Sequence, residues 1–276
     1  MTTSHHQQHL GLRDSAPAFG YGPLYALRTA RAWWYSAWLR TLARFSRTHL
    51  GSIWLGLSNL LSVALLSVVY GAVLDVPNPF AYAIYLGLGL TIWTLLSQSV
   101  TSGCLLLTVR RDHLVNNPFP AVFYCLEEWA FQMQTFMQAF LFVLLALAFI
   151  DSTILANAAL YMWLPLLNLF LFCLWTIMIM ALFGARFKDV GQLVPILLQL
   201  LFLLSPILYT PERISKVAFL ADFNLLYRVL SPLRMAVIDG YVSIPGQLVS
   251  LLVNSGILLI MLAVFKRLRY RLPLWV

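Results

Sequence analysis

Six long runs of mostly apolar residues constrain the fold of this chain more than any motif does. A helix advances about 1.5 Å per residue, so roughly 20 residues cross the ~30 Å hydrocarbon core of a bilayer. The second and fourth runs are long enough to tilt or to protrude. We therefore predict an all-α membrane protein with six transmembrane helices and both termini on one side. The runs lie near residues 53–74, 81–108, 126–149, 154–183, 193–210 and 246–265.

The composition excludes a soluble domain. Hydrophobic residues make up 61% and charged residues 10% of the 276 residues, whereas soluble domains carry about 25% charge. The mean hydropathy is +0.82. Three cysteines, Cys104, Cys125 and Cys173, lie in or beside apolar runs without paired spacing. They indicate buried small side chains, and no disulfide or metal site is expected.

Basic residues gather on one side of the predicted spans. They precede the first span or follow the second, fourth and last. Cytoplasmic loops carry an excess of Lys and Arg, so we predict that this side and both termini are cytoplasmic. The net charge of +8 arises from this rim, and no nucleic-acid partner is expected. The residues are Arg13, Arg28, Arg31, Arg40, Arg44, Arg47, Arg110, Arg111, Arg186, Lys188, Lys266, Arg267, Arg269 and Arg271.

Three segments flank the predicted six-span domain, residues 53–265. Residues 1–23 are polar and then rich in Gly and Pro, and we expect a disordered tail. Residues 24–52 are predicted to form a cytoplasmic amphipathic helix at the membrane interface, and residues 266–276 a basic cytoplasmic tail.

The amphipathic pattern is clearest in the second half of 24–52. Arg40, Arg44 and Arg47 fall on one helical face, and Gly51 follows where the chain must turn into the first span. Two interpretations remain open: a topology anchor, or the cytoplasmic mouth for an amphiphilic, lipid-linked substrate. The opposite face carries Trp34, Trp38, Leu42 and Phe45.

Prolines mark the irregular regions. Pro118 and Pro120 end any helix in the loop after the second span and hold Phe119 outward, as a knob for a partner's groove. Pro206 is expected to break the fifth span near its outer end. The stretch 211–245 then has apolar segments too short to span, which indicates re-entrant or interfacial helices. Glu127 and Glu128 are placed at the cytoplasmic start of the third span.

Four stretches in this order resemble permease subunits of type-2 ABC exporters for O-antigen and other cell-surface polysaccharides. They are RFSRTHLGSIWLGLS at 44–58, NPFP at 117–120, ARFKD with QLLFLLSP at 185–189 and 199–206, and the stretch 224–240. Lys188 stands where Arg is usual, and Leu225 and Ala236 replace prolines. No motif separates O-antigen from capsule, teichoic acid or another glycan.

The resemblance implies a homodimer with two ABC nucleotide-binding subunits, in a bacterial inner membrane. No G-x-x-x-x-G-K-[ST] motif or catalytic constellation occurs in the sequence, so we predict no enzyme activity and no cofactor in this chain, with ATP and Mg on the partner subunit. The substrate would be a polyprenyl-linked glycan. Docking of the ATPase subunit is predicted for Arg110, Arg111, Asn116 and Phe119.

Aromatic residues are the predicted wall of the glycan channel, because sugars stack on such rings. The alternative is that they face lipid or the core. A drug or small-lipid ABC exporter with the same fold is the main rival function. Inverted repeats and mid-membrane charges of a secondary transporter are not visible, nor are the acidic loop motifs of a glycosyltransferase. The candidate channel aromatics are Trp54, Tyr70, Trp93, Phe202 and Tyr209.

Overall fold

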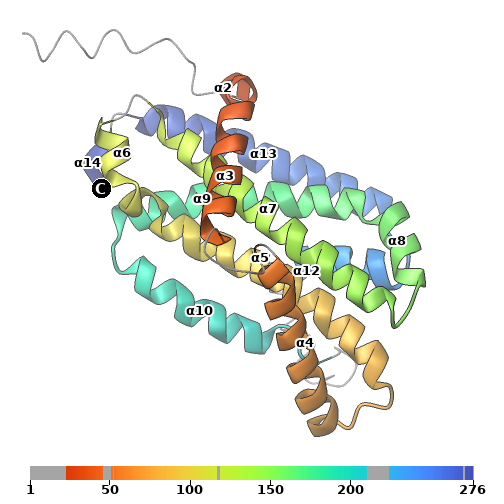
Figure 1. Ribbon diagram of the computed structural model, residues 1–276. Helices are drawn as coiled ribbons and strands as arrows, with labels where there is room; N and C mark the ends of the chain where they lie inside the picture. Colours follow the sequence, from red (N-terminus) through yellow and green to blue (C-terminus); the bar gives the residue numbers. More distant parts are fainter. Residues whose placement is uncertain are drawn as a thin grey trace, which may run out of the picture.

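The computed structural model describes residues 23–45, 51, 53–116, 119–209, 224–269 and 271–275. Within these ranges all regular structure is helical, which confirms the predicted fold class (Figure 1). The predicted tail up to residue 22, Arg47, and residues 210–223 of the predicted re-entrant region lie outside the described residues. The helices are α2 Pro23–Arg28, α3 Ala30–Phe45, α4 Ile53–Val73, α5 Pro79–Val109, α6 Arg111–Asn116, α7 Ala121–Ala148, α8 Thr153–Tyr161, α9 Trp163–Arg186, α10 Val190–Leu204, α12 Leu225–Ile238, α13 Ile244–Leu268 and α14 Leu272–Trp275.

Within the described residues, five helices are long and apolar enough to cross a membrane: α4, α5, α7, α9 and α13. The predicted fifth span is represented by α10, which has only 15 residues and is therefore about 22 Å long. It ends at Leu204 because Ser205 precedes Pro206 and adopts an extended conformation, with φ −80° and ψ 139°. The six-span arrangement thus consists of five full-length helices and one short one.

The predicted fourth span, 154–183, is two helices. α8 forms its first part and packs against α12 at one end of the bundle, whereas α9 crosses the bundle (Figure 1). Asp151 starts α8 by accepting hydrogen bonds from the Thr153 hydroxyl and backbone N–H, at 2.7 and 2.9 Å. Both hydrogen bonds lower the pKa of the Asp151 carboxyl, and the bond from the Thr153 hydroxyl has the larger effect.

Helix α5 is the centre of the bundle and packs against α4, α7, α9, α10 and α12. It begins where the Asn78 side chain accepts a hydrogen bond from Ala81 N, with Pro79 in the first turn. Its contact with α9 is close enough that a Cβ on Gly184 would collide with the carbonyl of Cys104. Small residues of this kind let membrane helices approach backbone to backbone.

Amide side chains attach α13 to α9. Asn168 Nδ2 donates to Gln247 Oε1 at 2.8 Å, and Trp175 Nε1 donates to Asn254 Oδ1 at 3.0 Å. We call Asn168, Trp175, Gln247 and Asn254 the amide ladder. All but the half-buried Trp175 are buried, so hydrogen bonds rather than apolar burial alone fix where α13 packs.

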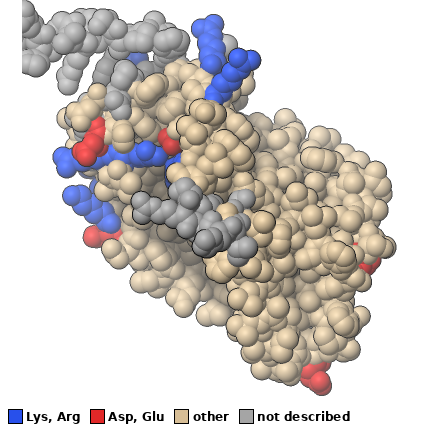
Figure 2. Space-filling view, in the orientation of Figure 1, with Lys and Arg blue, Asp and Glu red and all other residues tan. Residues whose placement is uncertain are grey.

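The two ends of the bundle differ in charge. α5, α9 and α13 finish and α7 begins at one end, where the basic residues of those helix termini lie; we call it the basic end. In the view of Figure 2 the Lys and Arg side chains gather there, and only acidic side chains are coloured at the opposite end.

Candidate functional site

Two buried carboxylates at the basic end hold three helices together. The Nη2 atom of Arg40, on α3, lies 2.6 Å from Oε2 of Glu128, and its Nη1 atom lies 3.9 Å from Oε1 of Glu127. Arg110, which follows α5, reaches Glu127 Oε1 with its Nη2 at 3.0 Å. Glu127 and Glu128 are only 5% and 3% exposed. We call these four residues the ion-pair cluster.

Hydrogen bonds extend the cluster along α7. Gln132 Nε2 donates to Glu128 Oε1 at 2.8 Å and to Ser102 Oγ at 3.2 Å. Gln134 Nε2 donates to the backbone carbonyl of Trp34 at 3.1 Å. The guanidinium of Arg40 also lies 4.0 Å above the Phe131 ring. Helix α3 is therefore fixed to the protein by buried polar contacts, in addition to any contact with a membrane surface.

The faces of α3 are arranged accordingly. Trp34, Trp38 and Leu42, on the predicted apolar face, are exposed, whereas Ala37 and Thr41 are buried against α7. Arg40 points into the ion-pair cluster rather than toward lipid phosphates. Arg44 is exposed and lines a neighbouring cavity.

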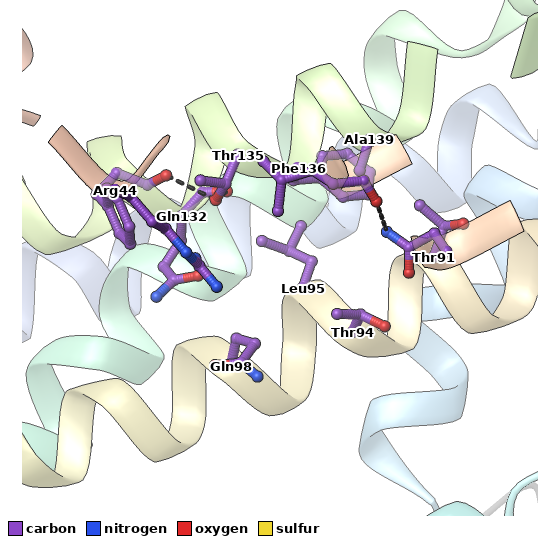
Figure 3. A pocket seen from close by; sticks show the side chains of 12 residues that line it. Arg44, Thr91, Thr94, Leu95, Gln98, Gln132, Thr135, Phe136 and Ala139 are labelled. Carbon is purple, nitrogen blue, oxygen red and sulfur yellow. Dashed lines mark hydrogen bonds between the residues drawn. The ribbon is translucent and has the colours of Figure 1, made fainter. Parts of the chain in front are cut away.

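A polar cavity of about 140 Å³ lies between α4, α5 and α7, next to the ion-pair cluster (Figure 3). Its polar lining is one guanidinium, three carboxamides and three hydroxyls. The lining side chains are Arg44, Leu55, Asn59, Thr91, Thr94, Leu95, Gln98, Phe131, Gln132, Thr135, Phe136 and Ala139.

Some of these groups are held in place by their own helices. Thr91 donates to the carbonyl of Gly87 at 2.8 Å, and Thr135 to that of Phe131 at 2.8 Å. Asn59 donates to the carbonyl of Leu55 at 3.2 Å. Gln98 is exposed, and its amide makes no hydrogen bond within the described part of the chain. The cavity thus offers both fixed hydroxyls and an amide that can bind a ligand.

The cavity continues as a polar stripe along α5. Thr94, Gln98 and Thr108 are exposed and Ser97 and Thr101 are half-buried, all in the half of α5 toward the basic end. The hydroxyls of Thr94 and Ser97 donate to carbonyls of their own helix. The exposed amide of Gln98 would be costly against lipid, so we expect this part of the stripe to face water, substrate or protein.

The other half of α5 is covered by the chain after α10. Tyr82 Oη donates to the carbonyl of Leu208 at 2.6 Å, and Tyr85 Oη to that of Pro206 at 2.8 Å. Arg234 of α12, only 4% exposed, donates to the same Pro206 carbonyl at 3.1 Å and lies 3.8 Å above the Tyr85 ring. We call residues 205–209 the outer plug. The outer plug therefore covers the half of α5 away from the basic end, and the polar stripe lies in the other half.

Of the five predicted channel aromatics, Tyr70, Phe202 and Tyr209 pack against one buried cluster of Tyr82, Leu86 and Leu208. Trp93 and Phe202 pack against each other between α5 and α10, with ring centroids 5.6 Å apart. Tyr209 belongs to the outer plug and donates to the carbonyl of Leu204. Trp54 is exposed and Tyr70 is half-buried, both on α4.

The polar lining was not anticipated from the sequence. Thr94, Gln98 and Thr101 recur at i, i+4 and i+7 within an apolar run, and this periodicity is the signal that could have revealed the stripe.

The predicted docking residues lie together at the basic end. Arg111 and Asn116 are exposed at the two ends of α6, and Phe119 is 47% exposed and stacks on Phe123 at 4.8 Å. Arg110 instead turns into the ion-pair cluster. Gly51 has φ +55°, a left-handed conformation that favours glycine, at the corner between α3 and α4.

Within the described residues, no group of three or more His, Cys, Asp or Glu could hold a metal ion. The features of the described residues are instead membrane-crossing helices, a polar cavity beside an exposed polar stripe, and a basic end, and together they are typical of a multi-span membrane protein.

The family described as ABC-2 type transporter matches residues 33–238. That range covers most of the chain, which therefore belongs to the ABC-2 type transporter family. It is the membrane component of an ABC transporter, a class that works with ABC ATPase subunits. No curated protein matches the sequence.

Proposed function

We propose that this permease exports a polyprenyl-linked, O-antigen-like polysaccharide across a bacterial inner membrane. It acts as a homodimer with two ABC nucleotide-binding subunits, and its basic end faces the cytoplasm. The observation that carries the proposal is the polar cavity with the stripe of hydroxyl and amide groups on α5.

The chemistry of this lining suits sugars. Sugar hydroxyls both donate and accept hydrogen bonds, as carboxamides and Thr hydroxyls do. Arg44 adds a guanidinium at the cavity, which suits the phosphate that links a glycan to its lipid. Pockets for drug-like ligands are predominantly apolar and aromatic, so the lining favours a glycan over a drug.

The position of the ion-pair cluster suits a role in coupling ATP hydrolysis on the nucleotide-binding subunits to transport past the polar cavity and the stripe on α5. Arg110 stands between α5, which carries the polar stripe, and α6, the predicted docking helix. Its partner Glu127 is also within reach of Arg40 on α3. A displacement of α6 by the ATPase subunit would thereby act on α3, α5 and α7 together.

A transport assay tests the proposal. The permease and its ATPase subunits, reconstituted in liposomes, should export a polyprenyl-linked glycan, and Gln98→Leu should slow export about three- to tenfold, as expected for one lost hydrogen bond. Gln138→Leu is the matched control, because Gln138 lies on α7 outside the cavity and its Oε1 makes no hydrogen bond within the described chain. ATPase activity that responds to drugs and not to the glycan would instead establish the rival function.

A further inference from the structure

A second, chemically different groove lies at the basic end, between α9 and α13. It measures about 360 Å³, within the roughly 300–1,000 Å³ of typical ligand pockets. Its walls are apolar: Phe183 and Phe187 line it on one side, Val264 and Leu268 on the other, and Trp275 of α14 closes its end. It shares no lining residue with the polar cavity.

One cation, Arg186, lines this groove, and two more, Arg267 and Arg271, are close in sequence to residues that line it. The Arg186 guanidinium lies 5.5 Å above the Trp275 ring, and its side chain contributes to the groove wall. Arg267 follows Val264 by three residues and so shares its side of α13. Arg271 comes just before α14. In the part of the chain that the structure describes, none of these three makes an ion pair, in contrast to Arg40 and Arg110.

The groove also lies at the ends of two membrane-crossing helices, where we expect lipid tails to meet headgroups. Its walls come from the last turns of two membrane-crossing helices, and the exposed basic residues follow directly. Trp at such a boundary is typical of the membrane interface. Basic pockets at this depth, beside an apolar slot, match a phospholipid with a negatively charged headgroup.

We propose that this groove binds one anionic phospholipid from the leaflet at the basic end. An acyl chain occupies the slot between Phe183 and Val264, and the phosphate lies at Arg186, with Arg267 and Arg271 beside it. A neutral lipid would fill the slot but leave the cations unmatched. The proposal does not rest on the exported substrate.

The bound lipid would stabilise the position of α14, a helix that contacts the predicted docking helix α6. Trp275 belongs to α14, which packs against both α9 and α6. A lipid in the groove would thereby hold α14 against the helix predicted to dock the ATPase subunit.

Native mass spectrometry of the purified permease–ATPase complex tests this site. Phosphatidylglycerol and phosphatidylcholine with identical chains are offered in turn. The wild type should bind phosphatidylglycerol at least about tenfold more tightly, and Arg186→Gln with Arg267→Gln should reduce that preference by on the order of fivefold per cation. Val264→Trp should lower the binding of both lipids, because it fills the slot.

Lys188→Gln is the matched control, since Lys188 is an exposed cation at the same end that does not line the groove. An equal loss in this control, or equal wild-type affinity for both lipids, would overturn the proposal. Phosphatidylglycerol with a photoactivatable acyl chain gives an independent result that needs no variant. It should crosslink to residues 179–187 or 261–268, and crosslinks confined to other helices would exclude the groove.

Discussion

Glu128 shows how one buried charge can organise a membrane protein. Its carboxylate contacts Arg40 from a helix that the sequence places at the membrane surface, and it accepts a hydrogen bond from Gln132 on its own helix. Removing one partner of a buried pair is costly because the other charge is left uncompensated.

At the residue scale we therefore predict that Glu128→Gln lowers the free energy of unfolding of the isolated permease by about 1–3 kcal/mol. The loss is smaller than for breaking a fully buried ion pair, because the Arg40 side chain is partly exposed. Thermal unfolding in detergent measures this, and limited proteolysis should show earlier cleavage within α3. Asp112→Asn, which removes an exposed carboxylate from α6, should leave both readings near wild type. Equal melting temperatures for the two variants would show that the ion pair contributes nothing to stability.

At the element scale, α6 and the outer plug lie at opposite ends of α5. α6 follows α5 directly at the basic end, and the plug covers the other half of the helix through the hydroxyls of Tyr82 and Tyr85. The predicted docking helix and the covering segment therefore lie at different ends of one helix.

We predict that α6 and the loop after it contact the ATPase subunit. A photoreactive residue at Asn116 or Phe119 should crosslink to that subunit, because both positions are exposed at the basic end. The same probe at Thr153, the first residue of α8, should give no such product. Crosslinks that arose only from residues 271–275 would move the docking surface to α14.

The sequence predicted where the helices begin and end better than it predicted which side chains of different helices contact each other. Run lengths located the spanning helices, and Pro206 located the end of α10, because proline restricts the residue before it. The division at Met162 was missed, although Pro165 in the first turn of α9 is a sequence signal for the start of a helix. The pairing of Arg40 with Glu128 could not be predicted, because nothing in one sequence identifies contacts between residues that far apart.

The polar cavity was missed for the same reason. Asn59, Gln98 and Thr135 come from three helices, and each alone is typical of a polar residue that joins two helices.

At the scale of the whole molecule, the charge asymmetry predicts orientation. In a variant without native cysteines, Thr153→Cys should react with an impermeant thiol reagent in intact cells, and Asn116→Cys only after the membrane is opened, because the excess of Lys and Arg predicts that the basic end faces the cytoplasm. Both positions are exposed in the structure. Labelling of Asn116→Cys in intact cells would reverse the orientation. Ser215, another position expected outside, lies beyond the described residues.

The amide ladder also bears on how the protein is made. Among the described spanning helices α13 is the last to be synthesised, and its apolar character suffices for insertion on its own. Its correct place is then selected when Gln247 and Asn254 meet Asn168 and Trp175. A chain truncated before residue 244 would leave Asn168 unsatisfied in the bilayer, at a cost of several kcal/mol per polar group. A chain without α13 would therefore expose an unsatisfied amide on α9, which the chain with α13 does not. Quality-control proteases that degrade unassembled membrane helices would recognise this amide.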